Sequence, residues 1–175
     1  DKVVMSFYFG HAIKTDGTLW GFGMNSDGQL GQNSIQSPGN SGLSSPVQIP
    51  GTNWASISRS YDNGVLATKT DGTLWSWGGG GGELGQNNNT HFSSPTQIGT
   101  GTSWKIDTTM GISYNSMAVA NNGDLFSFGS NNYGQLGMNS RTPASSPIQV
   151  PGTWTQAYVG GRNADARVSG ALKQS

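Results

Sequence analysis

Residues 14–20 read Lys-Thr-Asp-Gly-Thr-Leu-Trp, and the same seven residues return at 69–75. A looser copy, Ala-Asn-Asn-Gly-Asp-Leu-Phe, occupies residues 120–126. The Asp-Gly and Asn-Gly pairs are typical of a type I′ hairpin turn, in which both central residues have positive φ. Residues 18–22, after the first turn, follow the two-residue alternation of a strand. Each copy therefore predicts a β-hairpin.

Three further landmarks follow every hairpin in the same order, so the repeat covers nearly the whole chain. A Gly-Gln-Leu-Gly-type segment predicts a tight turn with one buried leucine. A Ser-Ser-Pro segment predicts the start of a strand, where proline costs no ladder hydrogen bond, and a tryptophan marks another strand. These landmarks are residues 28–31, 82–85 and 134–137; residues 44–46, 93–95 and 145–147; and Trp54, Trp104 and Trp154. Four short strands in each unit of about fifty residues, without helical periodicity, predict an all-β fold of β-propeller repeats.

The single repeat region 1–175 divides into units at approximately 12–66, 67–117 and 118–170, with partial strands at both ends. These units predict about three four-stranded blades and part of a fourth. Three blades alone would leave sheet edges and blade faces uncovered. We therefore expect the chain to be part of a larger ring or assembly, formed by a longer parent protein, by self-association or by a protein partner. The repeat count does not give the number of blades in that ring.

The combined pattern resembles the regulator-of-chromosome-condensation repeat family, above all at Trp-Ser-Trp-Gly (75–78) and Phe-Ser-Phe-Gly (126–129). The resemblance implies a propeller of about seven four-stranded blades. It departs from the family at the Gly-x-x-His-Ser-type element before the alanine of each hairpin. The positions three residues before the alanines are Gly64, Asn115 and Val168, and His11 lies directly before Ala12 instead. The family's exchange activity on a small GTPase depends on residues that have no clear counterpart here, so the resemblance implies the fold rather than that activity.

The composition first suggests disorder, because 28 glycines and seven prolines occur among 175 residues. The repeat places many of them at turns, and the net charge is zero with 10% aromatic residues, unlike a disordered tail. Nine basic residues balance nine acidic ones without a cluster, which argues against nucleic-acid binding. No run of roughly 18 apolar residues predicts membrane insertion. The absence of cysteine excludes disulfides and thiolate chemistry.

The residues that could carry catalysis are few, and each has a structural explanation. His91 lies in a polar loop, and His11 has no partner at the spacing of a catalytic triad or metal site. Glu83 occupies the glutamine position of its repeat, and the glycines at 78–82 lack the Lys-Ser/Thr of a phosphate loop. We therefore predict no enzyme, no catalytic or metal-binding residue and no cofactor.

The function predicted from these residues is a non-enzymatic protein-interaction or structural module. Its uncharged, Ser-, Asn- and Gly-rich surface favours an extracellular or virion-surface setting, although the compartment, the organism and the partner stay open. Two alternatives also stay open: a regulator of another enzyme, such as a small-GTPase exchange factor or a hydrolase inhibitor, and a carbohydrate-binding adhesin. The candidate contact residues for a protein or glycan ligand are Tyr61, Phe92 and Tyr133.

Overall fold

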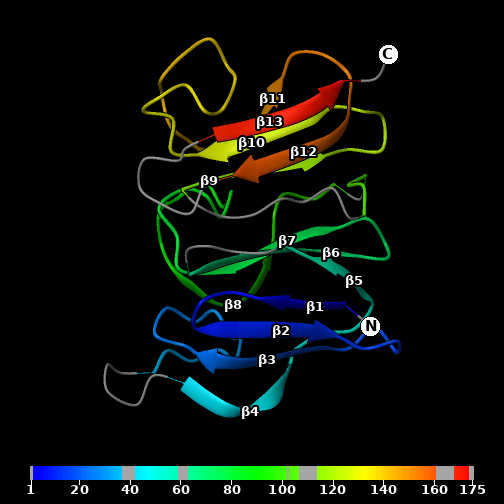
Figure 1. The fold of residues 1–175 in the computed structure, drawn as a ribbon, viewed down its shortest axis with the longest axis vertical. Helices are drawn as coiled ribbons and strands as arrows, with labels where there is room; N and C mark the ends of the chain where they lie inside the picture. Colours follow the sequence, from blue (N-terminus) through cyan, green and yellow to red (C-terminus); the bar gives the residue numbers. More distant parts are fainter. Residues whose placement is uncertain are drawn as a thin grey trace.

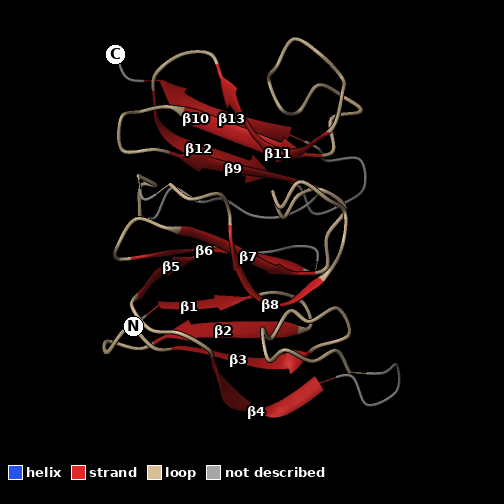
Figure 2. Cartoon of the chain, turned by 180° about the vertical axis from the view of Figure 1, so that it is seen from behind, coloured by secondary structure: helices blue, strands red, loops and turns tan. Residues whose placement is uncertain are grey.

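The computed structural model describes residues 2–36, 42–58, 63–101, 103–106, 114–160 and 168–173. Within these residues the regular structure consists of β-strands only, and no helix long and apolar enough to cross a membrane occurs among them (Figure 2). The strands form antiparallel sheets that follow one another along the long axis of the molecule in chain order (Figure 1). The all-β propeller-repeat fold predicted from the sequence is confirmed.

The sheets are the blades of the repeat, and we number them in chain order. The first contains β1 (Lys2–Met5), β2 (Phe9–Ile13), β3 (Leu19–Met24) and β4 (Gly42–Ile49). The second contains β5 (Trp54–Ile57), β6 (Gly64–Lys69), β7 (Leu74–Gly78) and β8 (Phe92–Gln97). The third contains β9 (Asn115–Val119), β10 (Leu125–Gly129) and β11 (Ala144–Val150), and the fourth contains β12 (Trp154–Gly160) and β13 (Val168–Lys173).

The third blade differs from the second at its first strand. In the second blade Trp54 begins β5 and pairs with Lys69 across the sheet. In the third blade the corresponding pairing is a single bridge between Trp104 and Ala120. Each predicted repeat unit spans the end of one sheet and the beginning of the next. These units are residues 12–66, 67–117 and 118–170.

The hairpins lie where the sequence places them, but their turns are not of type I′. The N–H of Lys14 donates to the carbonyl of Thr18, so the loop has three residues rather than two. Only Gly17 has positive φ, at 78°, while Asp16 does not. This is a three-residue loop with a glycine bulge, and the carboxylate of Asp16 stabilises it by accepting the N–H of Thr18 at 2.9 Å. The 69–73 and 120–124 turns repeat this backbone pattern.

The prolines also differ from their predicted position. Pro46, Pro95 and Pro147 lie inside β4, β8 and β11 rather than at the starts of these strands. Each of these strands is the outer edge of its sheet, and its register shifts at the Ser-Ser-Pro segment. A proline in an edge strand at a bulge interrupts no ladder hydrogen bond, which explains why an interior position is tolerated.

The core lies between neighbouring sheets. The leucines of the Gly-Gln-Leu-Gly turns, Leu30, Leu84 and Leu136, are fully buried, as predicted. Leu30 packs with Trp54 and Trp77 in the cluster between the first and second blades. A second cluster, with Leu84 and Phe128, joins the second blade to the third, and a third cluster joins the third to the fourth. Burial of these side chains holds successive blades face to face.

Candidate functional site

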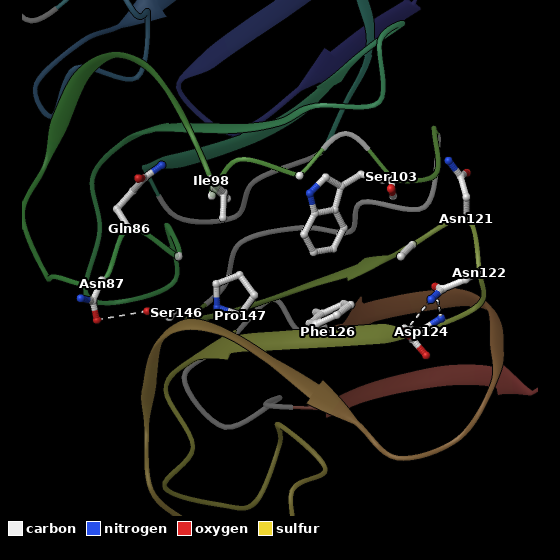
Figure 3. A pocket seen from close by; sticks show the side chains of 15 residues that line it. Gln86, Asn87, Ile98, Ser103, Asn121, Asn122, Asp124, Phe126, Ser146 and Pro147 are labelled. Carbon is white, nitrogen blue, oxygen red and sulfur yellow. Dashed lines mark hydrogen bonds between the residues drawn. The ribbon is translucent and has the colours of Figure 1, made fainter.

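A pocket of about 670 Å³ lies between the second and third blades. The second blade contributes Gln86, Asn87 and Ile98 on one side, and the third contributes the hairpin 120–124 and the strands β10 and β11 on the other (Figure 3). A pocket of this volume falls in the range of sites that bind small molecules or single side chains of a partner.

The inside of the pocket is aromatic and apolar. The rings of Trp104 and Phe126 meet edge to face, with centroids 5.1 Å apart and planes at 71°. Ile98 and Ala120 are buried beneath them, and Pro147 completes the apolar surface. These half-buried aromatic rings offer a ligand both apolar contact and the negative face of a π-system.

The rim of the pocket is polar. Asn122 Nδ2 donates to Asp124 Oδ2 at 2.7 Å, and the N–H of Asp124 donates to Asn122 Oδ1 at 3.1 Å (Figure 3). On the opposite side Ser146 Oγ donates to Asn87 Oδ1 at 3.1 Å, which ties the two blades together. These short hydrogen bonds fix the rim, and Asp124 supplies the one carboxylate among the described lining residues.

The equivalent place between the first and second blades is filled by a lysine. Lys69 Nζ lies 4.7 Å from the ring centroid of Trp54 and 4.2 Å from that of Trp75. The two rings are 5.9 Å apart with planes at 73°, close to the geometry of Trp104 and Phe126. The lysine side chain thus lies against both rings, and we call this junction the closed one.

A chain of hydrogen bonds supports the filled junction. Trp75 Nε1 donates to Thr73 Oγ1 at 2.7 Å, and Thr73 Oγ1 donates to Asp71 Oδ1, also at 2.7 Å. The Thr73 hydroxyl, and then its backbone N–H, hold the pKa of the Asp71 carboxyl below its usual value. The same chain links Trp20, Thr18 and Asp16 in the first blade, where Lys14 Nζ lies 3.9 Å from the Trp20 ring centroid.

The third copy of the repeat, which forms one side of the pocket, has other residues at these positions. Ala120 replaces Lys69 at the position that pairs with the strand-starting tryptophan. Phe126 replaces Trp75, and Asp124 replaces Thr73. The aromatic pair remains, the side chain that covers it is gone, and a carboxylate stands where the closed junction has a hydroxyl.

Of the contact residues predicted from the sequence, the two that the structure describes do not line this pocket. Tyr61 is outside the described residues. Phe92 is half-buried in β8 and packs against the two core clusters on either side of the second blade. Tyr133 is 69% exposed in the loop after β10, where its N–H donates to Gln135 Oε1. Neither Phe92 nor Tyr133 lines the pocket. The signal that could have found the pocket is Ala120, because it occupies a lysine position in the repeat.

The two histidines lie apart from the pocket. His11 is buried, and its Nε2 donates to the carbonyl of Gln29 at 3.0 Å. Burial lowers the pKa of His11 from 6.5 to about 4, against a smaller opposing effect of this hydrogen bond. His91 Nδ1 lies 3.4 Å from Asp27 Oδ1 at a smaller hollow between loops. In the described part of the chain no three His, Asp or Glu side chains gather as a metal site.

Comparison with known families explains the repeat. The Regulator of chromosome condensation (RCC1) repeat matches residues 16–61 and 122–164, and a second form of the same repeat matches residues 108–135. The chain belongs to the RCC1 repeat family. The matched segments contain the hairpin, the Gly-Gln-Leu-Gly turn and the Ser-Ser-Pro strand that define the repeat in this sequence.

Two relatives match most of this chain. The chain is 36% identical to Protein RCC2 homolog of Danio rerio over 132 residues, covering 73% of this chain and 26% of that protein. It is 30% identical to Probable E3 ubiquitin-protein ligase HERC4 of Homo sapiens over 143 residues, covering 81% and 13%. The chain therefore spans about a quarter or less of these relatives.

The structural comparisons confirm the RCC1 propeller fold. Prp20p from Saccharomyces cerevisiae superposes with a TM-score of 0.81 at 20% identity, covering all of this chain and 44% of that one. Human WBSCR16 superposes with a TM-score of 0.75 at 17% identity, covering 90% and 42%. At this identity the likeness establishes the fold alone.

Proposed function

We propose that the chain is a non-enzymatic protein-interaction module of the RCC1 type, and that it docks a segment of a partner protein in the pocket between the second and third blades. The observation that carries this proposal is the open junction: an aromatic surface formed by Trp104 and Phe126, bordered by ordered polar groups. Aromatic anchors with a polar rim are the arrangement that dominates binding energy at protein interfaces.

Related proteins support a role in protein binding. Prp20p binds Gsp1p and histones. A second solved structure shows Kap60 bound to the same yeast protein. Those partners belong to Prp20p, of which this chain matches less than half. What carries over to the proposal is the use of a propeller as a protein-binding surface rather than the identity of any partner.

The relatives give no support for an extracellular or virion setting, and neither forms part of the proposed function. Regulation of a small GTPase or a hydrolase remains a prediction that rests on the family resemblance alone. Nucleotide-exchange assays on small GTPases test the first of these, and a glycan array with Tyr133→Ala tests carbohydrate binding at the loop tips.

A peptide-display selection tests the docking proposal with a library that samples many possible partner segments. Random peptides are selected on the wild-type chain and then measured on Ala120→Lys, which restores the lysine of the closed junction, and on Ser45→Lys, which adds the same charge at an exposed position of β4. We expect selected peptides to lose binding on Ala120→Lys and to keep it on Ser45→Lys. Failure to select any peptide, or equal binding to both variants, would overturn the proposal.

A further inference from the structure

We propose that the pocket between the second and third blades accepts a basic side chain, lysine or arginine, from the partner. This inference rests on the proposed docking function and specifies the chemistry of the bound residue. The partner's side chain would occupy the place that the chain's own lysine fills in the neighbouring junction.

The molecule itself shows which side chain this geometry accepts. Lys69 Nζ lies within 4.7 Å of two ring centroids, at Trp54 and Trp75. Lys14 Nζ lies 3.9 Å from the ring centroid of Trp20 in the first blade. A cation over the face of an aromatic ring at these distances is held by the ring's quadrupole. Two copies of the repeat therefore place an ammonium group on the aromatic residue that follows the hairpin.

The receiving groups persist in the third copy. The centroids of Trp104 and Phe126 are 5.1 Å apart at 71°, against 5.9 Å at 73° for Trp54 and Trp75. The wall of the junction persists as well: Gly51 approaches Lys69 Nζ in the closed junction, and Gly101, three residues before Trp104, lines the open one. The ammonium group is missing, because Ala120 ends at its Cβ atom.

The charge of the open pocket favours a cation more than the closed junction does. Asp124 is half-buried at the rim, at the position where the second blade has Thr73. Its Oδ2 accepts one hydrogen bond, from Asn122, at 2.7 Å. No lysine or arginine is among the described residues that line the pocket. A basic side chain entering from outside would be attracted to the aromatic rings and to the Asp124 carboxylate, whereas a neutral side chain would lack both charge attractions.

The size and opening of the pocket suit a flexible side chain from a second molecule. Its volume of about 670 Å³ exceeds what one lysine fills, which leaves room for neighbouring residues of the partner's backbone. The ordered rim at Asn87 and Ser146 offers polar groups beside the apolar interior. A peptide with a central basic residue therefore fits the site better than a free amine.

The direct test follows the indole Nε1–H signals of the tryptophans by NMR. The probes are N-acetyl-lysine N-methylamide and its uncharged analogue N-acetyl-norleucine N-methylamide, both at millimolar concentration, with the Trp104 signal assigned through Trp104→Phe. We expect a saturable shift of the Trp104 signal with the lysine probe, and binding about tenfold weaker with the norleucine probe. Ala120→Lys should abolish the shift, Asp124→Asn should weaken binding several-fold, and Ser45→Lys should leave it unchanged.

The outcomes separate this inference from the docking proposal. An equal response of Trp104 to both probes, or no response to the lysine probe, overturns the basic-side-chain inference. Selected peptides that lack lysine and arginine but lose binding on Ala120→Lys would support the docking proposal and overturn the basic-side-chain inference. Peptides that bind irrespective of Ala120→Lys would instead overturn docking at this site.

Discussion

Two of the blade junctions contain the same kind of aromatic pair, but only one of them has a lysine lying against it. In the junction between the first and second blades, Lys69 lies against Trp54 and Trp75 and fills the space. In the junction between the second and third blades, Trp104 and Phe126 keep the same edge-to-face geometry around a pocket of about 670 Å³. A pocket is thus present where one copy of the repeat lacks a side chain that its neighbours retain.

The junctions also differ in their cores. Trp77 and Phe128 occupy the same repeat position and are both fully buried. Trp77 Nε1 donates to the carbonyl of Gln29 at 3.0 Å, so it joins the first and second blades by a hydrogen bond as well as by packing. Phe128 has no donor and packs against the Leu84 cluster alone. The open junction has a buried hydrogen bond of its own, from Ser116 Oγ to the carbonyl of Glu83 at 2.8 Å.

Removal of the core ring gives the largest expected effect. Trp77→Ala should lower the free energy of unfolding by about 3–5 kcal/mol, because a large buried ring and its hydrogen bond are both lost. Phe128→Ala should cost somewhat less, because only packing is lost. Urea denaturation of both variants measures this order. A loss below about 1 kcal/mol for Trp77→Ala would contradict the assignment of this ring to the junction core.

Acid should weaken the closed junction through His11. The pKa of His11 is about 4 in the folded chain against 6.5 ordinarily, so the unfolded state binds the proton first as the pH falls. The stability contributed by neutral His11 is complete above pH 6.5 and declines by about 3 kcal/mol toward pH 4. The ring lies edge-on to Trp77, so its protonation would act at the junction itself.

The control replaces His11 by methionine, since Met117 occupies the same repeat position in the third blade. Urea midpoints at about pH 7 and about pH 4.5 measure the effect, because these values bracket most of the decline. The wild-type chain should lose stability between them, and His11→Met should lose much less. Equal losses for both chains would show that His11 does not carry the pH dependence.

Replacing Lys69 by alanine should make the junction between the first and second blades resemble the one between the second and third. Lys69→Ala should cost about 1 kcal/mol of stability, the size of a partly buried cation–π interaction. It should also open a second pocket, visible as a new response of the Trp54 indole signal to the lysine probe. Urea denaturation and the NMR titration measure the two effects. No shift of the Trp54 indole signal with the lysine probe would show that the absence of the lysine is not what opens the pocket.

Removing the charge of the Asp71 carboxylate, which accepts hydrogen bonds in the hairpin turn, should have the smallest effect on stability. Asp71→Asn copies Asn122 of the open junction into the closed one and removes a charge-assisted acceptor for Thr73. The group is exposed and solvent screens it, so we expect a loss of about 0.5 kcal/mol. The melting temperature measures it, with Asn122→Asp as the reverse exchange. A loss above about 2 kcal/mol would show that the hydrogen-bond chain to Trp75 holds the junction more strongly than the lysine does.

Much of the fold could be predicted from the sequence, because the same turn and strand patterns occur three times along the chain. The hairpin positions and the buried Leu30, Leu84 and Leu136 follow from turn chemistry and spacing. The turn type could not be predicted, because Asp-Gly suits both a two-residue turn and the three-residue loop that Lys14 and Thr18 close. The bulge that admits Pro46 depends on the register against β3, which the local sequence does not specify.

The candidate site was harder to predict, because it is a space between blades rather than a motif. Tyr133 is an aromatic residue in a loop, which favours it as a contact residue, and it is exposed but away from the pocket. Ala120 departs from the lysine of the other copies. That departure indicates a pocket only when the positions of Trp104 and Phe126 on either side of it are known.

In this proposal, the residue at the position shared by Lys69 and Ala120 determines which junction binds a basic side chain. The decisive measurement is the NMR titration of the double variant Lys69→Ala/Ala120→Lys with N-acetyl-lysine N-methylamide. We predict that the response moves from the Trp104 indole to the Trp54 indole, with weaker binding because Thr73 supplies no charge. A response that stays at Trp104, or that appears at neither ring, would contradict this role of the exchange.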